Sequence, residues 1–388
     1  MFARLSRLRA VAARILLLAV GIGLAACQTT TAPSGNMGGG PVPVALLVPG
    51  GSAEVSDNYI ATSLENAARM AIADLGGVQI DLRVYQTQGS PEQAAAMATK
   101  AVDDGAQIIL GPFYALEANA AGQAVASRGV NVLSFSNNTD VAGGNVFLLG
   151  QTFDATARRL ASYAVAQGKG RVMVIHDPDP AGIVGKAAIE RAVAGAGGTI
   201  SAVSTYEFSQ NGVVQAVPAI VSSARSSGAQ VLFLTADTAG ALPLLSQLLK
   251  DNGLGGAATQ FIGLSRWDIP PATLALPGVQ GAWFALPDPA TNQQFQARYA
   301  AAYGEAPPIY AGFAYDGIAA IGAIAKQGAE GGLTAANLTQ GAGFVGVGGI
   351  FRLRPDGTTD RGLAIAQIQD SQVVIVDPAP SSFGGAGF

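Results

Sequence analysis

The chain has 388 residues, of which 49% are hydrophobic and 12% are charged, enough apolar material to bury a core over two domains. Its 22 basic and 26 acidic residues give a formal net charge of −4, which argues against nucleic-acid binding because neutralising phosphates needs a basic surface. The single cysteine, Cys27, excludes an internal disulfide.

The first 26 residues are typical of a secretory signal. Residues 1–14 contain four arginines and no acid, and an apolar run of ten residues, 15–24, follows. At about 1.5 Å per residue, a helix of that length cannot cross a hydrocarbon core of about 30 Å. Ala25, Ala26 and Cys27, which follow Leu24, resemble the lipobox of bacterial lipoproteins. The resemblance implies removal of residues 1–26 and lipidation of Cys27.

The residue after Cys27 indicates where the lipid inserts. In bacterial lipoproteins an aspartate there marks retention at the inner membrane, and this chain has Gln28. We therefore expect a periplasmic protein anchored in the inner leaflet of the outer membrane of a Gram-negative host. Residues 27–41 would carry the lipid and form a flexible tether, because they are rich in Gly, Thr and Pro without apolar periodicity. Residues 378–388 are expected to form a loose tail. The mature chain would have 18 basic and 26 acidic residues, a net charge of −8.

After the tether, short apolar runs alternate with alanine-rich stretches of helical spacing. The runs predict strands over 42–48, 78–85, 107–110, 131–135 and 146–149, then over 171–175, 199–205, 230–235 and 260–262. The alanine-rich stretches predict helices, among them 64–75, 91–102, 115–126 and 181–194. Continuous apolar strands between helices are typical of parallel sheets covered on both faces, so the predicted fold class is α/β. In such sheets, ligands bind at the carboxyl ends of the strands.

The residues that enzymes use for catalysis are scarce. The only histidine, His176, lies beside Asp177 after a predicted strand, where a solvated or capping role is expected. No nucleophile, Walker or paired-histidine motif occurs. Residues 341–346 match the spacing of a dinucleotide-binding loop but follow no clear strand. We therefore expect neither an enzyme nor a cofactor or metal.

Six short segments, taken in order and spacing, carry a family resemblance. They are 45–48, 64–68 with Ala71, 107–112, 131–134, 315–317 within a helix over 310–325, and 349–351 with 356–357. From Val42 to Asp377 the chain resembles the type I periplasmic binding proteins of the leucine/isoleucine/valine-binding class. The resemblance implies two Rossmann-like lobes with parallel sheets, joined by three chain crossings and closing over a ligand. Lobe 1 would comprise 42–149 plus 280–328, and lobe 2 would comprise 150–279 plus 329–377. Residues 351–354 and 363–376 would form strands of lobe 2.

The same resemblance implies a set of ligand-binding residues. The family's carboxylate-binding serine falls on Ala115, with Tyr114 before it, and its pocket tyrosine falls near Ala181. The residues that grip the amino acid fall on Ser136, Asn137 and Asn138. On lobe 2, Asp237 would pair with an ammonium and Trp267 would form an apolar wall. Losing both the serine and the tyrosine argues against a free amino acid as the ligand.

Each of these residues also has a purely structural interpretation. Ser136, Asn137 and Asn138 are residue types that favour a turn before a helix. Asp237 could cap a helix over 239–250. Trp267 could be a buried anchor. The two interpretations stay open at this point.

Two functions fit the sequence. The first is a membrane-anchored lipoprotein that binds a small polar, amino-acid-like solute between its lobes and delivers it to an ABC permease. The alternative is a penicillin-binding protein activator, a similar domain that contacts a peptidoglycan synthase. Gln28 and the altered pocket positions favour the alternative, whereas the family as a whole favours solute binding. The tether is short for an activator, because 14 extended residues span at most about 50 Å.

Overall fold

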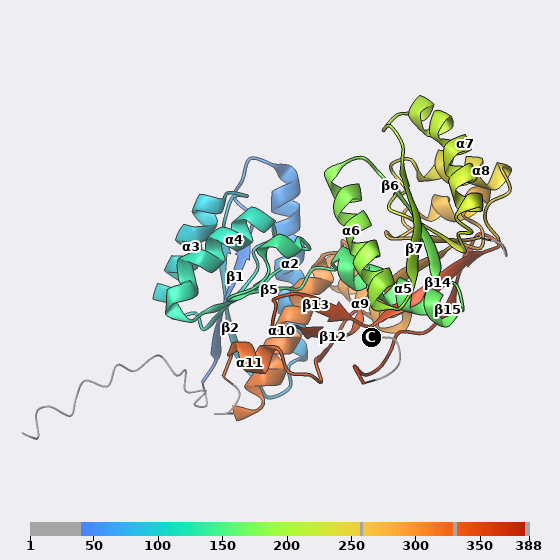
Figure 1. Ribbon diagram of the computed structural model, residues 1–388. Helices are drawn as coiled ribbons and strands as arrows, with labels where there is room; N and C mark the ends of the chain where they lie inside the picture. The colour runs from blue at the N-terminus through green and yellow to red at the C-terminus, as the bar shows by residue number, and fades with distance from the viewer. Residues whose placement is uncertain (1–39, 257–258, 329–331, 385–388) are drawn as a thin grey trace, which may run out of the picture. The chain divides into compact units, whose positions relative to one another are not determined.

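The structure is a computed structural model that describes residues 40–256, 259–328 and 332–384 (Figure 1). The predicted signal peptide, Cys27 and the predicted tether up to residue 39 lie outside the described residues, as does the end of the predicted tail. Within the described ranges, no helix is both long and apolar enough to span a membrane.

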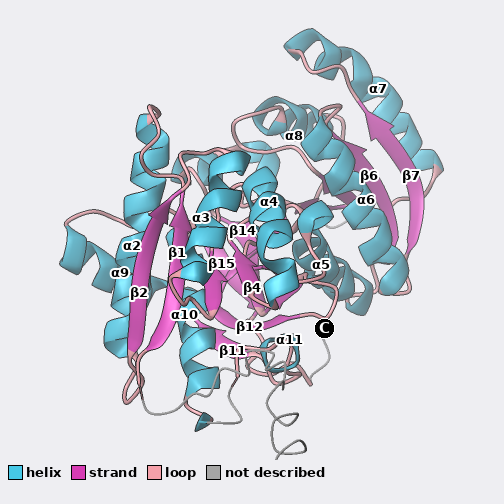
Figure 2. Ribbon diagram, turned by 90° about the vertical axis from the view of Figure 1, so that its left-hand side faces the viewer, coloured by secondary structure: helices cyan, strands magenta, loops and turns pink. Residues whose placement is uncertain are grey.

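The first sheet is parallel throughout and has the strand order β2-β1-β3-β4-β5 among the described residues. Its strands are β1 (Val42–Val48), β2 (Ile80–Gln86), β3 (Ile108–Leu110), β4 (Asn131–Ser134) and β5 (Val146–Leu148). The intervening helices are α2 (Val55–Asp74), α3 (Pro91–Asp103) and α4 (Ala115–Val125). Figure 2 shows β1 and β2 side by side.

Alternation along β1 explains how this sheet is covered on both faces. Val44 and Leu46 belong to an apolar core with α2 and α10 (Ala311–Ala325). Ala45 and Leu47 belong to a separate core with α3 and α4. Because successive strand residues face opposite sides, a continuous apolar strand needs helices on both faces. The helix α9 (Pro289–Tyr303) joins the first of these cores through Phe295 and Tyr299.

The second sheet is mixed and has the order β15-β14-β10-β9-β8-β6-β7. Its strands are β6 (Arg171–His176), β7 (Thr199–Thr205), β8 (Val231–Leu234), β9 (Gln260–Gly263), β10 (Trp283–Pro287), β14 (Leu363–Gln369) and β15 (Gln372–Asp377). β6 to β10 are parallel, while β14 and β15 form an antiparallel hairpin at one edge. One face packs on α5 (Phe153–Ala166) and α6 (Pro180–Gly195). The other packs on α7 (Gln210–Ser226) and α8 (Leu242–Asp251).

A small antiparallel sheet contains β11 (Phe344–Gly346), β12 (Gly349–Leu353) and β13 (Thr359–Arg361). Phe344, Phe351 and Leu353 pack into the core that holds α2 and α10. A short helix, α11 (Ala335–Leu338), precedes this sheet. In the described residues the chain therefore passes between the two large sheets after β5, after β10 and after β13.

The structure confirms the predicted α/β class, and a strand lies at each predicted strand position. Two placements differ from the prediction. Residues 280–328 were expected in lobe 1, but the strand Trp283–Pro287 within them pairs with β9 and β14 of the second sheet. Residues 329–377 were expected in lobe 2, with a strand over 351–354, but β11 and β12 pair with each other and pack in the core that holds α10. Apolar runs predict that a strand exists, whereas its partner depends on contacts distant in sequence.

The turn at Gly111 provides a test of the fold at the end of β3. Gly111 has a φ of +90°, and a Cβ there would overlap the Leu47 carbonyl oxygen of the adjacent strand. We expect Gly111→Ala to lower the free energy of unfolding by about 2–4 kcal/mol, from strain plus overlap. Gly105→Ala is the control, because Gly105 has a φ of +97° but open space around it, and about 1 kcal/mol is expected. Urea unfolding of the purified variants measures both values, and equal losses would contradict the role of the overlap.

Candidate functional site

A cavity of about 520 Å³ is lined by residues of both large sheets and their connections. Many of them follow directly on parallel strands: 113–115 after β3, 135–138 after β4 and 264–266 after β9. Others come from α5, α9 and α10, from residues 307–310, and from Arg361 at the end of β13. The carboxyl ends of the strands therefore build the site, as the sequence predicts for parallel sheets.

Aromatic side chains make much of the lining apolar. The lining includes Phe113, Tyr114, Phe135, Phe153, Phe295, Tyr310 and Phe313. Phe113 packs edge-to-face with both Tyr114 and Tyr310, at centroid distances of 5.2 and 5.1 Å. Burial raises the pKa of Tyr310 to about 12, so this phenol stays neutral at ordinary pH. Such rings present rigid apolar surface to a bound molecule.

Five of the seven predicted ligand-binding residues line this cavity: Tyr114, Ala115, Ser136, Asn137 and Asn138. Residues 136–138 also form the turn that their residue types favour. Asn138 Oδ1 accepts the Asp140 N–H at 2.9 Å, and Ser136 Oγ accepts the Asn138 N–H at 3.1 Å. The turn thus holds these side chains at the edge of the cavity.

Asp237 and Trp267 are not among the described lining residues. Asp237 is exposed, and its Oδ1 accepts the backbone N–H groups of Ala239 and Gly240 at 3.0 and 2.6 Å, so it caps the turn before α8. Trp267 is fully buried in the core of the second sheet, where its Nε1 donates to the Ala236 carbonyl at 3.3 Å. Their surroundings match the structural interpretation of each residue. Ala181 is exposed at the start of α6.

Tyr114 is held in place by a chain of hydrogen bonds. Its hydroxyl donates to Asp57 Oδ1 at 2.6 Å, and its backbone N–H donates to Glu117 Oε2 at 3.4 Å. Glu117 is buried and also accepts a hydrogen bond from Thr87. Burial, and then the hydrogen bond to Asp57, raises the pKa of Tyr114, while burial raises the pKa of Glu117. The start of α4 is therefore rigid where it meets the cavity.

The structure adds charged lining residues that the sequence did not single out as ligands: Arg266, Asp316 and Arg361. Arg361 Nη1 donates to Asp316 Oδ2 at 2.7 Å, and their side chains are 8% and 1% exposed. Arg361 Nη2 donates to the Leu149 carbonyl, and Asp316 Oδ1 accepts the Val347 N–H at 2.8 Å. Asp316 did lie in a segment of the family resemblance, whereas Arg361, among ordinary charged residues, gave no local signal.

Two polar atoms at the cavity have no partner. Among the described residues, Ser265 Oγ and Arg361 Nε are the buried side-chain nitrogen or oxygen atoms without a hydrogen bond, and both residues line the cavity. Leaving such an atom unsatisfied costs about 1–3 kcal/mol, and native proteins rarely tolerate it without a reason.

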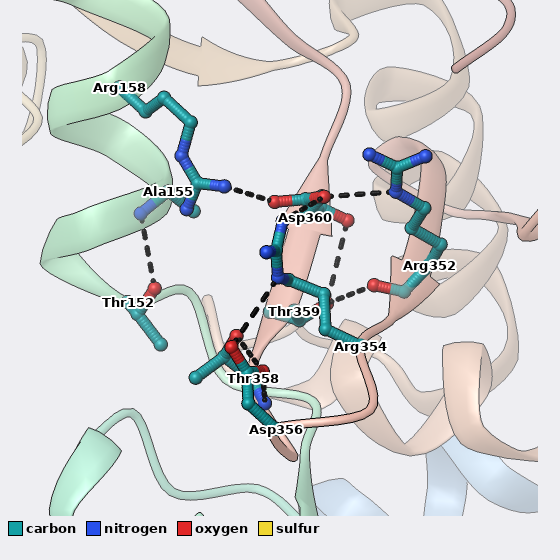
Figure 3. A network of polar contacts seen from close by, with 9 residues as sticks. All are labelled: Thr152, Ala155, Arg158, Arg352, Arg354, Asp356, Thr358, Thr359 and Asp360. Carbon is teal, nitrogen blue, oxygen red and sulfur yellow. Dashed lines mark hydrogen bonds and ion pairs between the residues drawn. The ribbon is translucent and has the colours of Figure 1, made fainter. Parts of the chain in front are cut away.

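A cluster of ionic contacts fixes the strand that carries Arg361 (Figure 3). Asp360 accepts from Arg158 of α5 at 2.7 Å, from Arg352 of β12 at 2.9 Å and from Arg354 at 3.3 Å. Because adjacent strand residues face opposite sides, Asp360 contacts this cluster while Arg361 contacts the cavity.

Removing the carboxylate of Asp360 tests this cluster. Asp360→Asn leaves three guanidinium groups without their shared anion, and we expect a loss of about 2 kcal/mol in the free energy of unfolding. This is less than the 3–5 kcal/mol typical of a fully buried pair, because the arginines are 26–39% exposed. Asp356→Asn is the matched control, since Asp356 is 58% exposed and 3.6 Å from Arg354, and less than about 0.5 kcal/mol is expected. Urea unfolding that gives the same value for both variants would contradict the assignment.

Comparisons with known proteins agree with this architecture. A model of the periplasmic binding protein family matches residues 41–372. A branched-chain amino acid ABC transporter protein from Rhodospirillum rubrum, titled as putative, superposes with a TM-score of 0.72 at 19% identity, over 87% of this chain and 100% of that chain. A substrate-binding protein from Desulfitobacterium hafniense, in complex with Leu, gives 0.61 at 17% identity, over 87% and 100%.

A solute-binding protein from Rhodopseudomonas palustris, in complex with 3,4-dihydroxybenzoic acid, gives a TM-score of 0.57 at 18% identity, over 87% of this chain and 96% of that chain. The comparison with curated proteins found no match. At these identities the structural likeness establishes the fold, while the family model covers most of the chain. The chain therefore belongs to the type I periplasmic binding protein family.

Proposed function

We propose that the protein is a lipid-anchored periplasmic binding protein that captures a small solute in the cavity of about 520 Å³ and delivers it to an ABC permease. The observation that carries the proposal is the convergence of strand-end loops from both sheets on one cavity, whose lining combines aromatic rings with polar residues such as Asn137 and Asn138. The volume lies within the usual range of about 300–1,000 Å³ for small-molecule sites.

The ligands of the compared proteins support a small carboxylate. The Desulfitobacterium protein holds Leu and the Rhodopseudomonas protein holds 3,4-dihydroxybenzoic acid, and both molecules carry a carboxyl group. We infer that Tyr114, Ala115, Ser136, Asn137 and Asn138 contact the solute at the end of the cavity formed by the first sheet. Asp237 and Trp267 are left out of this contact set because of their positions.

The alternative role is activation of a peptidoglycan synthase. It rests on Gln28, which stands where an inner-membrane lipoprotein has aspartate, and on Ala115 and Ala181, which stand where the family has a serine and a tyrosine. No feature of the cavity favours it, since a protein-contact module has no need of a polar pocket lined with rings. The proposed role likewise requires binding without catalysis.

Lipid anchoring is tested on the native N-terminus. We expect mass spectrometry of the membrane-extracted protein to find Cys27 as a diacylated and N-acylated first residue, because two acyl signals give stable anchoring. Cys27→Ser should abolish lipidation and the cleavage that follows it, so that residues 1–26 stay on the chain, with Ser6→Ala in the signal as a control that leaves both steps unchanged. An unmodified thiol in the native protein, or a Cys27→Ser protein that carries the same lipid mass, would overturn this part of the proposal. Fractionation of inner and outer membranes tests the assignment based on Gln28.

Solute binding is tested by thermal shift. The purified protein is screened against amino acids, amides, nucleosides and small aromatic acids, and a ligand at about 100 times its Kd should add about 2.7 kcal/mol of stability. With the best ligand, we expect Asn138→Ala to weaken binding about tenfold by calorimetry, because Asn138 lines the cavity and its side chain is lost. Asp237→Ala is the control outside the cavity, where affinity should stay unchanged. If no compound of the panel stabilises the protein and the native protein captures a murein synthase, the alternative role is favoured.

A further inference from the structure

The end of the chain runs from the second sheet to the small sheet. It leaves β15 at Asp377, where Arg159 of α5 donates through Nη2 to the Asp377 carboxylate and, at 3.3 Å, to the Pro378 carbonyl. Arg159 is 6% exposed, and its Nε donates to the Leu363 carbonyl of β14 at 2.8 Å. One buried guanidinium therefore fixes the start of residues 378–384 to the second sheet.

The other end of this segment lies on the small sheet. The Arg352 guanidinium of β12 lies over the Phe383 ring, with 4.6 Å between Cζ and the ring centroid. A Cβ built on Gly343 would come 2.7 Å from the same ring, so Phe383 also packs directly against the backbone that precedes β11. The ring is therefore held by two separate parts of the small sheet.

Between its ends the segment passes the point where the chain returns to the second sheet. Gly362 is the single residue between β13 and β14. A Cβ on Gly362 would come 3.0 Å from the Pro380 carbonyl oxygen and 2.7 Å from Ile350 Cγ1 of β12. Pro380 thus lies against the third of the three chain crossings, where a hinge between the lobes has to bend.

These contacts make residues 378–384 a fourth connection between the lobes. The small sheet packs through Phe351 into the core of the first sheet, whereas Arg159 packs on the second. A hinge motion turns the lobes about their crossings, and it changes the distance between the two anchors, Arg159 and Arg352. The five residues that lead from Pro378 to Phe383 span at most about 18 Å. A wide separation of the anchors therefore requires the ring to leave Arg352.

The contact at Phe383 can open without unfolding either lobe. The ring is half-buried and the Arg352 side chain is 26% exposed, and the attraction between a ring and an exposed guanidinium is modest. When the ring leaves, Arg352 keeps its ion pair with Asp360 at 2.9 Å. Figure 3 shows Asp360 between Arg352 and Arg158 of α5, which it also pairs with. Release of the ring therefore leaves this ionic cluster in place.

We propose that residues 378–384 form a strap that limits how far the two lobes open, with Phe383 under Arg352 as its releasable end. The inference goes beyond the proposed function, because it concerns the motion of the lobes and holds for any solute. The alternative is a tail that only shields the small sheet. Such a tail would contribute to stability without changing the distance between the lobes.

The test measures the distance between the lobes in the purified protein after dialysis to remove bound solute. Nitroxide labels are placed at Val55→Cys, at the start of α2, and at Ala181→Cys, at the start of α6, and pulsed electron spin resonance gives their separation. Both positions are exposed, follow the carboxyl end of a parallel strand and lie on helices that cover different sheets. The parent chain without these cysteines shows any label taken up at Cys27.

Two changes release the strap. In the Phe383→Ala protein, and in a chain that ends at Pro378, we expect the mean label distance to lengthen by about 3 Å or more, whereas helices that merely slide past one another move about 1–2 Å. Phe208→Ala is the matched control, because it removes a 60% exposed ring of the same kind away from the strap, and its distance should equal that of the parent. Urea unfolding of each variant is measured alongside.

Unchanged distances in both released proteins would overturn the strap, and a lower urea midpoint with unchanged distance would identify a tail that only shields the small sheet. A longer distance in the shortened chain alone would support the strap and overturn the role of Phe383 as its releasable end. The measurement uses no solute. Its failure therefore leaves the proposed function standing, and a negative solute screen leaves the strap standing.

Discussion

The buried ion pair between Arg361 and Asp316 is the interaction on which the cavity depends. Arg361 also holds the carbonyl of Leu149, just after β5, and Asp316 also holds the N–H of Val347, before β12. One pair therefore joins β13, α10 and two connecting segments. Burying two charges is favourable only when their other nitrogen and oxygen atoms also have hydrogen-bond partners. In this pair every side-chain nitrogen and oxygen except Arg361 Nε has one. The exception, Arg361 Nε, belongs to a residue that lines the cavity.

The parallel strands of the two large sheets supply the rest of the site. A parallel strand ends where its crossover connection begins, so the loops after β3, β4 and β9 lie at the sheet edges where ligands bind in such folds. The helices that cover both faces leave these edges uncovered by regular structure. The strand β13 then adds the charged side chain of Arg361 to a lining of aromatic and polar residues, and the Asp360 cluster fixes the other side of that strand.

The local features of this architecture were predictable from the sequence, and the distant pairings were not. Apolar runs such as 42–48 and 231–234 mark strands because burial on both faces leaves them without polar alternation. Trp283–Pro287 has the same apolar character whichever sheet it joins, so its place could not be read from its residues. Tyr114 and Asn138, which line the cavity, were found because the family resemblance implies ligand-binding residues at these positions. Arg361 was missed because its partner Asp316 lies in a different segment of the chain, and only the fold brings them together.

The two unsatisfied atoms at Ser265 and Arg361 have a consequence for heat resistance. A ligand-free molecule carries their desolvation penalty continuously, about 1–3 kcal/mol for each atom, out of a total stability that is typically about 5–15 kcal/mol. At Ser265 an apolar side chain of similar shape would remove that penalty, whereas at Arg361 it would leave the buried Asp316 carboxylate without its cation. Substitution can therefore raise thermal robustness at Ser265, while at Arg361 the ion pair with Asp316 outweighs the penalty of one unsatisfied atom.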